Sequence, residues 1–453
     1  MRIGLKIAMV LALTLAILIP LSLVRGVIAE RQSYRAQAVA DIERAYAGPQ
    51  VLAGPVLTVP YSEMVEVEEA DRAGSPVKVR RRVHRQWTYF PARLDVAGKL
   101  APTTRRLGIH EVRLYVWDGD VRGSFDIALP PAPDGAERTL GEPWLAWSIA
   151  DVRGIRGTPR AVVDGRELEL REGQGAREGS GVHVRLPAPS DGTRLRIESR
   201  LRLELGGAES LAVVPVGKRN RVALASSWPH PGFKGLSPWR SEVSARGFEA
   251  EWRLASVATD VQRQMLAGHA PMPITASRSP RVEVASRGGV DALGVVLADP
   301  VDAYTQADRA TKYGLLFVLL TFVGFFMFEV IRALRIHPIQ YALVGLALAV
   351  FFLLLVSLSE HLRFGVAYLI ASAACVGLIG FYVSAVLHSA LRGAGFAAML
   401  ALLYAALYGL LVSEDNALAL GSGLLFVVLA AIMIVTRRLD WYRAGAQFGT
   451  RAG

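Results

Sequence analysis

The sequence has 453 residues, of which 52% are hydrophobic, and its 51 Lys and Arg against 40 Asp and Glu give a formal net charge of +11. Residues 30–308 hold 38 basic and 35 acidic side chains, so most of the excess charge lies beside hydrophobic segments and argues against a nucleic-acid-binding surface. The single cysteine, Cys375, excludes an intrachain disulfide.

Six segments are apolar over the ~20 residues that a helix needs to cross a bilayer core of about 30 Å. They are residues 7–24, 313–331, 339–358, 364–387, 393–413 and 416–436. The first segment is long for the apolar part of a signal peptide, and Val24-Arg25-Gly26 is a poor cleavage site, so we interpret it as an uncleaved anchor.

These segments predict an α-helical membrane protein with four parts. They are an N-terminal anchor (1–29), a large outer domain (30–308), a five-helix bundle (309–436) and a basic tail (437–453). The short loops at 332–338 and 388–392 are basic, like the tail, whereas the loops at 359–363 and 413–415 are acidic to neutral. The positive-inside rule therefore predicts that both termini are cytoplasmic and that residues 30–308 are periplasmic.

The outer domain changes from helical to alternating hydrophobicity after residue 46. In residues 195–205, for example, apolar and charged side chains alternate, which is typical of a half-buried strand. Further strands are predicted at 51–59, 77–90, 112–117, 121–129, 161–170, 221–225, 248–254 and 281–285. Turn signals occur at Asp118-Gly119, Asp134-Gly135, Asp164-Gly165, Asp191-Gly192 and Gly206-Gly207. This pattern predicts a mainly-β, sandwich-like domain.

Motifs for hydrolases, zinc proteases, nucleotide binding and thiol redox chemistry are absent from the sequence. The histidines of the outer domain are not spaced as metal ligands, so we expect no metal and no cofactor, although a site built from distant residues stays open. The bundle keeps its acidic and histidine side chains near span ends, which disfavours ion-coupled transport.

Two strings of the outer domain are candidates for function. In Ser227-Trp228-Pro229-His230-Pro231, two prolines fix the imidazole in a rigid loop. This loop is either a recognition element or a buried pH-sensitive group, or else a structural turn with Trp228 in the core. Asp151-Val-Arg153-Gly resembles a phosphate-binding nest, but a turn or a helix cap explains it better.

Six further candidates lie beside the spans: Asp308, Arg309, Glu329, His337, Glu360 and His361. We expect Asp308 to cap the span that follows it and Arg309 to contact lipid headgroups. Glu329 is expected either to reach headgroups or to face a neighbouring helix.

Seven short segments along the chain carry a family resemblance: Gly48-Pro-Gln-Val-Leu-Ala-Gly-Pro55, Asp151-Val-Arg-Gly-Ile155, Ser227-Trp-Pro-His-Pro-Gly-Phe233, Asp308-Arg-Ala-Thr-Lys-Tyr313, His337-Pro-Ile-Gln-Tyr341, Ser357-Leu-Ser-Glu-His361 and Asp440-Trp-Tyr442. Together they resemble the CreD family of bacterial inner-membrane proteins, which are described as cell-envelope integrity proteins. The resemblance implies a periplasmic domain, an inner-membrane location and a regulon for envelope stress under a two-component system. It implies no catalytic residue.

The leading hypothesis is a non-enzymatic protein of the lipid bilayer that supports envelope integrity. Its outer domain would bind an envelope component (lipid, lipopolysaccharide or peptidoglycan) or a membrane protein partner. One alternative is an enzyme acting on peptidoglycan or lipid, with His230 and Asp151 as acid–base groups. The other is a transporter or flippase that works through the helix bundle.

Overall fold

The structure is a computed structural model that describes residues 3–70, 76–108, 110–132, 137–175, 177–274, 289–297, 303–332, 336–413 and 417–437. The chain divides into two compact units, Met1–Ala36 with Val301–Gly453, and Gln37–Pro300. Helix α2 (Leu18–Ala45) is continuous through the first change of unit.

The first unit consists of apolar helices. They are α1 (Ile3–Ala16), the start of α2, α5 (Ala303–Arg332), α6 (Pro338–Ser359), α7 (Phe364–Val386), α8 (Ala390–Val412) and α9 (Ala417–Thr436). Among the described residues, five helical stretches have the length and hydropathy to cross a membrane, and Ala419–Ile434 within α9 is a shorter apolar stretch. These helices confirm the six predicted apolar spans.

Aromatic rings fill the centre of this bundle. The Tyr404 ring of α8 packs edge-on against Phe317 of α5 and Phe351 of α6, with ring centroids 4.6 and 4.7 Å away. Small residues let the helices approach: a Cβ added to Gly345 would come within 2.8 Å of Ile17 and Phe322 side-chain atoms. Close packing around small residues is how helices associate where lipid removes the hydrophobic driving force.

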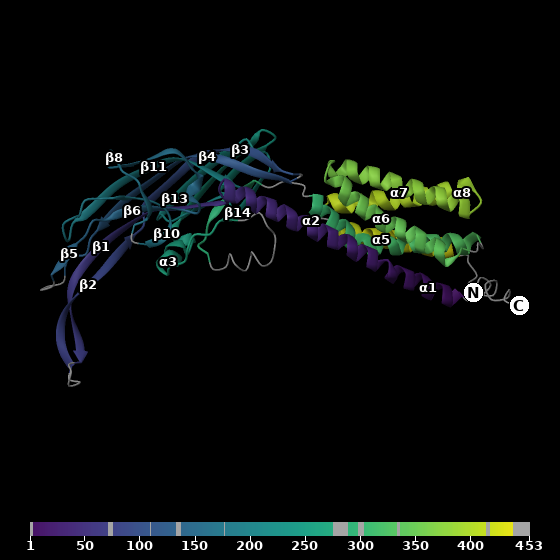
Figure 1. The fold of residues 1–453 in the computed structure, drawn as a ribbon, viewed down its shortest axis with the longest axis horizontal. Helices are drawn as coiled ribbons and strands as arrows, with labels where there is room; N and C mark the ends of the chain where they lie inside the picture. The colour runs from purple at the N-terminus through teal and green to yellow at the C-terminus, as the bar shows by residue number, and fades with distance from the viewer. Residues whose placement is uncertain are drawn as a thin grey trace. The chain divides into compact units, whose positions relative to one another are not determined.

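The second unit is built from two β-sheets (Figure 1). Within the described residues, nine strands form the first sheet, in the order β14-β17-β12-β1-β6-β10-β9, with β2 and β5 also paired to β1. They are β1 (Gln50–Ala70), β2 (Pro76–Tyr89), β5 (Arg138–Leu140), β6 (Trp144–Ile149), β9 (Arg171–Gln174), β10 (Arg177–Arg185), β12 (Ser210–Val214), β14 (Pro231–Gly235) and β17 (Leu293–Leu297).

Eight strands of the described chain form the second sheet, in the order β15-β16-β13-β3-β4-β11-β7-β8. They are β3 (Arg93–Leu107), β4 (His110–Ala128), β7 (Ile155–Val163), β8 (Arg166–Leu168), β11 (Arg194–Ala208), β13 (Arg219–Ser226), β15 (Arg240–Ser244) and β16 (Gly247–Ala255). The apolar faces of both sheets share one core that includes Trp117, Trp147 and Trp252. The sandwich-like fold class is therefore confirmed.

Two predicted turns are wrong. Strand β4 runs straight through Asp118-Gly119, and β11 runs through Gly206-Gly207. These glycines mark close approach, because a Cβ on Gly119 would lie 2.4 Å from the Trp117 ring and one on Gly207 would lie 2.4 Å from the Tyr115 hydroxyl. Turn composition and close approach both select glycine, so the sequence did not separate them.

The other turn signals had mixed outcomes. The turn at Asp164-Gly165, with φ of 49° and 78°, joins β7 to β8 and splits the predicted strand 161–170 in two. A turn also forms at Asp191-Gly192. The predicted strand 281–285, the turn at Asp134-Gly135 and residues 438–453 of the tail lie outside the described residues.

Candidate functional site at the end of helix α2

Within the second unit, the end of helix α2 lies beside Asp151. This residue follows β6 and caps the 3-10 helix η1 (Val152–Gly154), where its carboxylate accepts a hydrogen bond from the Arg153 backbone N–H at 3.1 Å. The sequence interpretation as a helix cap is confirmed. A side-chain oxygen at this position satisfies a backbone donor that the helix itself leaves unpaired.

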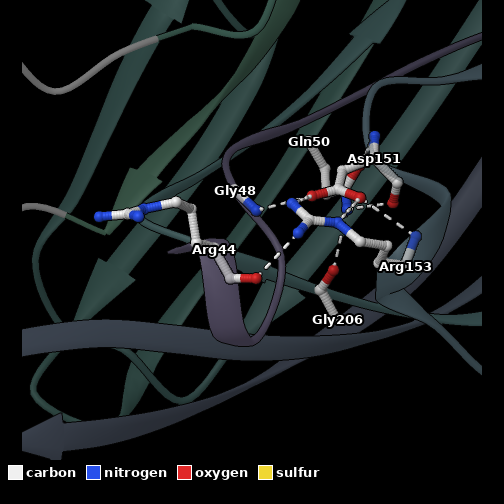
Figure 2. Close-up of polar contacts among 6 residues, drawn as sticks. All are labelled: Arg44, Gly48, Gln50, Asp151, Arg153 and Gly206. Atoms are coloured by element: carbon white, nitrogen blue, oxygen red, sulfur yellow. Dashed lines mark hydrogen bonds and ion pairs between the residues drawn. The ribbon is translucent and has the colours of Figure 1, made fainter. Parts of the chain in front are cut away.

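The Asp151 carboxylate also joins two chain segments (Figure 2). It accepts from the Gly48 N–H at 3.2 Å and from Nε and Nη2 of Arg153 at 2.9 and 2.6 Å. The Nη1 of Arg153 donates to the carbonyl of Arg44 at 2.8 Å. Carbonyls in the last turn of a helix have no partner within the helix, so Arg153 acts as a C-terminal cap for α2.

The Gln50 side chain completes the network. Its side chain is fully buried, and its Nε2 donates to the carbonyls of Asp151 and Gly206 at 2.9 and 3.0 Å. Its Oε1 accepts from the Asp151 N–H at 3.1 Å. Buried amides need such partners. Gly154 has to be glycine here, since an added Cβ would lie 2.2 Å from the Gly206 carbonyl oxygen.

The charges of this network stabilise each other. Hydrogen bonds from Arg153 lower the pKa of Asp151 and outweigh the effect of burial, which raises it. The same contact raises the pKa of Arg153. Asp151 is therefore a carboxylate at neutral pH, which suits a cap and an ion pair but not a proton donor.

Tyr46, directly after the end of α2, makes further contacts with the second sheet. Its ring lies beneath the guanidinium groups of Arg156 and Arg105, whose Cζ atoms are 4.4 and 5.9 Å from the ring centroid. Ile42 of α2 packs with Val112 of β4 in a small apolar cluster. The polar network, the ring contacts and this cluster together attach α2 to the second sheet.

The loop with Trp228 and His230 bends between β13 and β14. The Trp228 ring packs against the core, its Nε1–H donates to the His230 carbonyl at 3.0 Å, and the Arg113 guanidinium stacks over it at 4.7 Å. The His230 side chain is exposed, so the interpretation as a buried pH-sensitive group is wrong. Its role in recognition stays a prediction.

In the bundle, Glu329 is fully buried. Its Oε1 accepts from the Ile336 N–H at 3.0 Å, and its Oε2 accepts from the Tyr341 hydroxyl at 2.9 Å. Glu329 therefore faces α6, and the alternative in which it reaches headgroups is wrong. His337 caps α6 by accepting from the Ile339 N–H, while Gln340 accepts from the His337 N–H in return.

Glu360 ends α6 and is largely buried, with 9% of its side chain exposed. One carboxylate oxygen accepts from the Tyr304 hydroxyl of α5 at 3.3 Å and pairs with Nε of Arg31 in α2, also at 3.3 Å. Its neighbour His361 is exposed and lies near the Ser357 carbonyl, with Nδ1 at 3.4 Å. Glu360 thus connects three helices of the first unit.

Asp308 does not cap a helix. Helix α5 already begins at Ala303, so Asp308 lies in its second turn, where the carboxylate pairs with Lys312 at 2.7 Å. The predicted cap was misplaced because the sequence signal for the span begins only at Tyr313, whereas the helix extends beyond the apolar segment. Arg309 lies in the same helix, and its contact with headgroups stays a prediction.

Sequence reasoning missed Gln50, Arg44, Arg31 and Tyr304 as partners in these networks. A signal existed only for Gln50, an amide directly before an apolar strand, since a buried polar side chain requires partners. Among the described residues, no group of three or more His, Cys, Asp or Glu side chains is placed to hold a metal ion.

Comparisons with known proteins give one strong match. The family model described as inner membrane protein CreD matches residues 2–442. The inner membrane protein CreD of Escherichia coli (strain K12) is 36% identical over 439 residues, covering 96% of this chain and 93% of that protein.

Solved structures give no useful likeness. Two forms of the M1 zinc metallopeptidase of Deinococcus radiodurans, one of them a mutant, match at TM-scores of 0.20 (mutant) and 0.18, with 11% and 10% identity. Each match covers 36% of this chain and 38% of the peptidase chain, and neither supports an inference about fold or activity.

Proposed function

Because this chain belongs to the CreD family of inner membrane proteins, we propose that it is a non-enzymatic protein that supports the cell envelope. Its second unit (Gln37–Pro300), called the β unit below, binds an envelope component or a partner protein. The apolar helices hold the protein at the inner membrane. Both termini are cytoplasmic and residues 30–308 are periplasmic, as the basic loops indicate.

One observation carries this proposal: the polar candidates of the β unit serve its own architecture. Asp151 and Arg153 cap two helices, and Trp228 packs against the core. The partners of Asp151 are Gly48, Gln50 and Arg153, whereas His230 contacts Trp228. These two sets of partners offer no support for an acid–base pair of Asp151 and His230, which disfavours the enzyme alternative.

The transporter alternative is also less favoured. The rings of Phe317, Phe351 and Tyr404 occupy the centre of the bundle. A substrate path through it would require these helices to move apart.

Photo-crosslinking in cells tests the proposal on the full chain. A benzoylphenylalanine replaces Trp239, whose side chain is 62% exposed on the β unit, or Trp252, which is 1% exposed, as the matched control. We expect an adduct with an envelope component or protein at Trp239→benzoylphenylalanine that persists in a His230→Ala background. Absence of any adduct from a series of exposed positions across both sheets would contradict the proposal. Loss of the envelope phenotype in His230→Ala would favour the enzyme instead.

A further inference from the structure

Strands β1 and β2 continue as a two-stranded hairpin beyond the other strands that pair with β1 (Figure 1). Their register runs from the Leu57–Tyr89 pair to the Ala70–Pro76 pair. Within the described residues, β2 pairs only with β1, so it forms an outer edge of the first sheet. An edge strand carries main-chain N–H and C=O groups that can pair with another chain.

Hydrogen bonds on the opposite side of β1 show in which direction its main-chain groups point. The Pro60 carbonyl accepts from the Gly141 N–H, and the Met64 N–H donates to the Glu137 carbonyl. Both partners flank β5, which pairs with β1 on the side away from β2. Because the direction of main-chain groups alternates along a strand, the even-numbered residues of this part of β1 bond away from β2.

The same alternation decides which residues of β2 face the open edge. Met64 lies opposite Arg82 in the register, with Arg80 and His84 two positions to either side of Arg82. Since the main-chain groups of Met64 point away from β2, those of Arg82 point away from β1. Arg80 and His84 follow Arg82 in this. All three residues therefore present their N–H and C=O groups at the edge of the sheet.

The side chains of these three residues form a basic row on one face of the hairpin. All three are exposed, and they share a face because side chains two positions apart point the same way. Neighbours in the row are about 6.8 Å apart along the strand. Nε of Arg80 lies 3.9 Å from Oε1 of Glu66, whereas no ion pair joins Arg82 to another described residue. Across the hairpin from Arg82, Met64 carries no charge.

We propose that the open edge of β2 binds an extended acidic segment of a partner protein as an added antiparallel strand. In antiparallel pairing, the residue that exchanges both main-chain bonds with Arg82 also lies directly opposite its side chain. Acidic residues at every second position of the partner then meet the members of the basic row one by one, with the same spacing. Opposite charges attract across strands and like charges repel, so the row admits acidic strands and excludes basic ones.

Binding of a labelled peptide to the full-length protein tests this edge. The probe is a short peptide in which glutamate and valine alternate, and nanodiscs of phosphatidylcholine hold the protein without adding a net lipid charge. A second probe has N-methylated glutamates, which keep the charge but lack the N–H groups that face β2. The variant is Arg82→Glu. The matched control is Arg202→Glu, an exposed arginine of β11, a strand that is paired on both sides.

We expect the glutamate–valine peptide to bind the wild type and Arg202→Glu equally. It should bind Arg82→Glu at least about fivefold more weakly, because an attraction across the strands becomes a repulsion. The N-methylated peptide should not bind. Equal binding of both peptides, or an equal loss in both variants, would overturn the proposal, since attraction between charges alone would explain either result.

This inference rests on the proposed function, because it names the class of partner that the β unit binds, but the two can fail separately. If the glutamate–valine peptide does not bind while crosslinking from exposed positions still traps a partner, only the inference about β2 is overturned. Self-association of the wild type that Arg82→Glu abolishes, without peptide binding, would also overturn it and would identify a second copy of the chain as the occupant of the edge.

Discussion

The Arg153 guanidinium donates to the Arg44 carbonyl at 2.8 Å, and so a residue that follows β6 caps the C-terminal end of helix α2. Arg153 is itself oriented by Asp151, whose two carboxylate oxygens accept from Nε and Nη2. The cap of α2 and the cap of η1 therefore depend on one carboxylate. Variants at this carboxylate should weaken the attachment of α2 to the second sheet and leave the strand pairing of both sheets unchanged.

Asp151→Ala should lower the unfolding free energy of the β unit by about 1 kcal/mol, because a side-chain cap is lost. Hydrogen exchange should rise at residues 42–48. The matched control is Asp126→Ala, which breaks an exposed pair with Arg194 and should leave exchange at α2 unchanged. Urea unfolding and exchange mass spectrometry on the full chain in nanodiscs measure both effects, and equal exchange in the two variants would contradict the role of Asp151.

Gln50→Leu should lower the free energy of unfolding of the β unit further, by roughly 2–3 kcal/mol. The leucine fits the volume but leaves the Asp151 N–H and the Gly206 carbonyl buried without their partner. Gln86→Leu, an exposed position on β2, is the control and should have little effect. The midpoint of urea unfolding distinguishes them, and similar midpoints would mean that the Gln50 bonds contribute nothing net.

Asp120 should make the β unit sensitive to acid. Burial raises its pKa, but hydrogen bonds from Arg200 and Arg122 outweigh burial and lower the pKa to about 2. An acid whose pKa is lower in the folded state stabilises the fold above its unfolded pKa and loses that contribution as pH falls through the folded value. The stability difference between the wild type and Asp120→Asn should therefore be constant above about pH 4 and shrink toward pH 2, as unfolding measured across this range will show.

Glu43 should behave in the opposite way. Burial, and then the nearby charge of Glu209, raise the pKa of Glu43. A proton held more tightly in the folded state stabilises the fold at low pH, and this contribution is lost as pH rises through the folded pKa. Glu43→Gln should therefore be more stable than the wild type at neutral pH, with the gain disappearing in acid. A gain that is the same at all pH values would exclude ionisation as the cause.

Tyr341→Phe should destabilise the bundle by roughly 1–3 kcal/mol, because it removes a hydroxyl donor from the buried Glu329 carboxylate. Tyr382→Phe in α7, a half-buried tyrosine, serves as the control. Thermal unfolding in detergent should show a lower midpoint for Tyr341→Phe alone. Equal midpoints would indicate that Glu329 is satisfied by its other contacts.

Much of the fold was predictable because its signals are local. Apolar length predicted the spans, and alternation predicted strands such as residues 195–205, where Leu201 and Leu205 are fully buried. Glycine was the exception. Asp164-Gly165 turns, whereas Asp118-Gly119 stays extended, because Gly119 pairs with Gly98 of β3 and Leu203 of β11, which lie far away in the sequence.

The candidate site was predictable only in part. A cap at Asp151 follows from residue type and local spacing, since the bond to the Arg153 N–H spans two residues. Its bond to Gly48 spans 103 residues and the bond of Gln50 to Gly206 spans 156, so no local pattern encodes them.

The sequence by itself determined that this chain has six apolar spans and a mainly-β unit, because burial in lipid or in a sandwich imposes its own period on hydrophobicity. Only the tertiary structure decided how α2 is held. The carbonyl of Arg44 acquires its donor from Arg153, and Ile42 of α2 packs in one cluster with Val112 and Leu114 of β4. Those contacts join segments that are distant in sequence, and side-chain geometry selects them rather than composition.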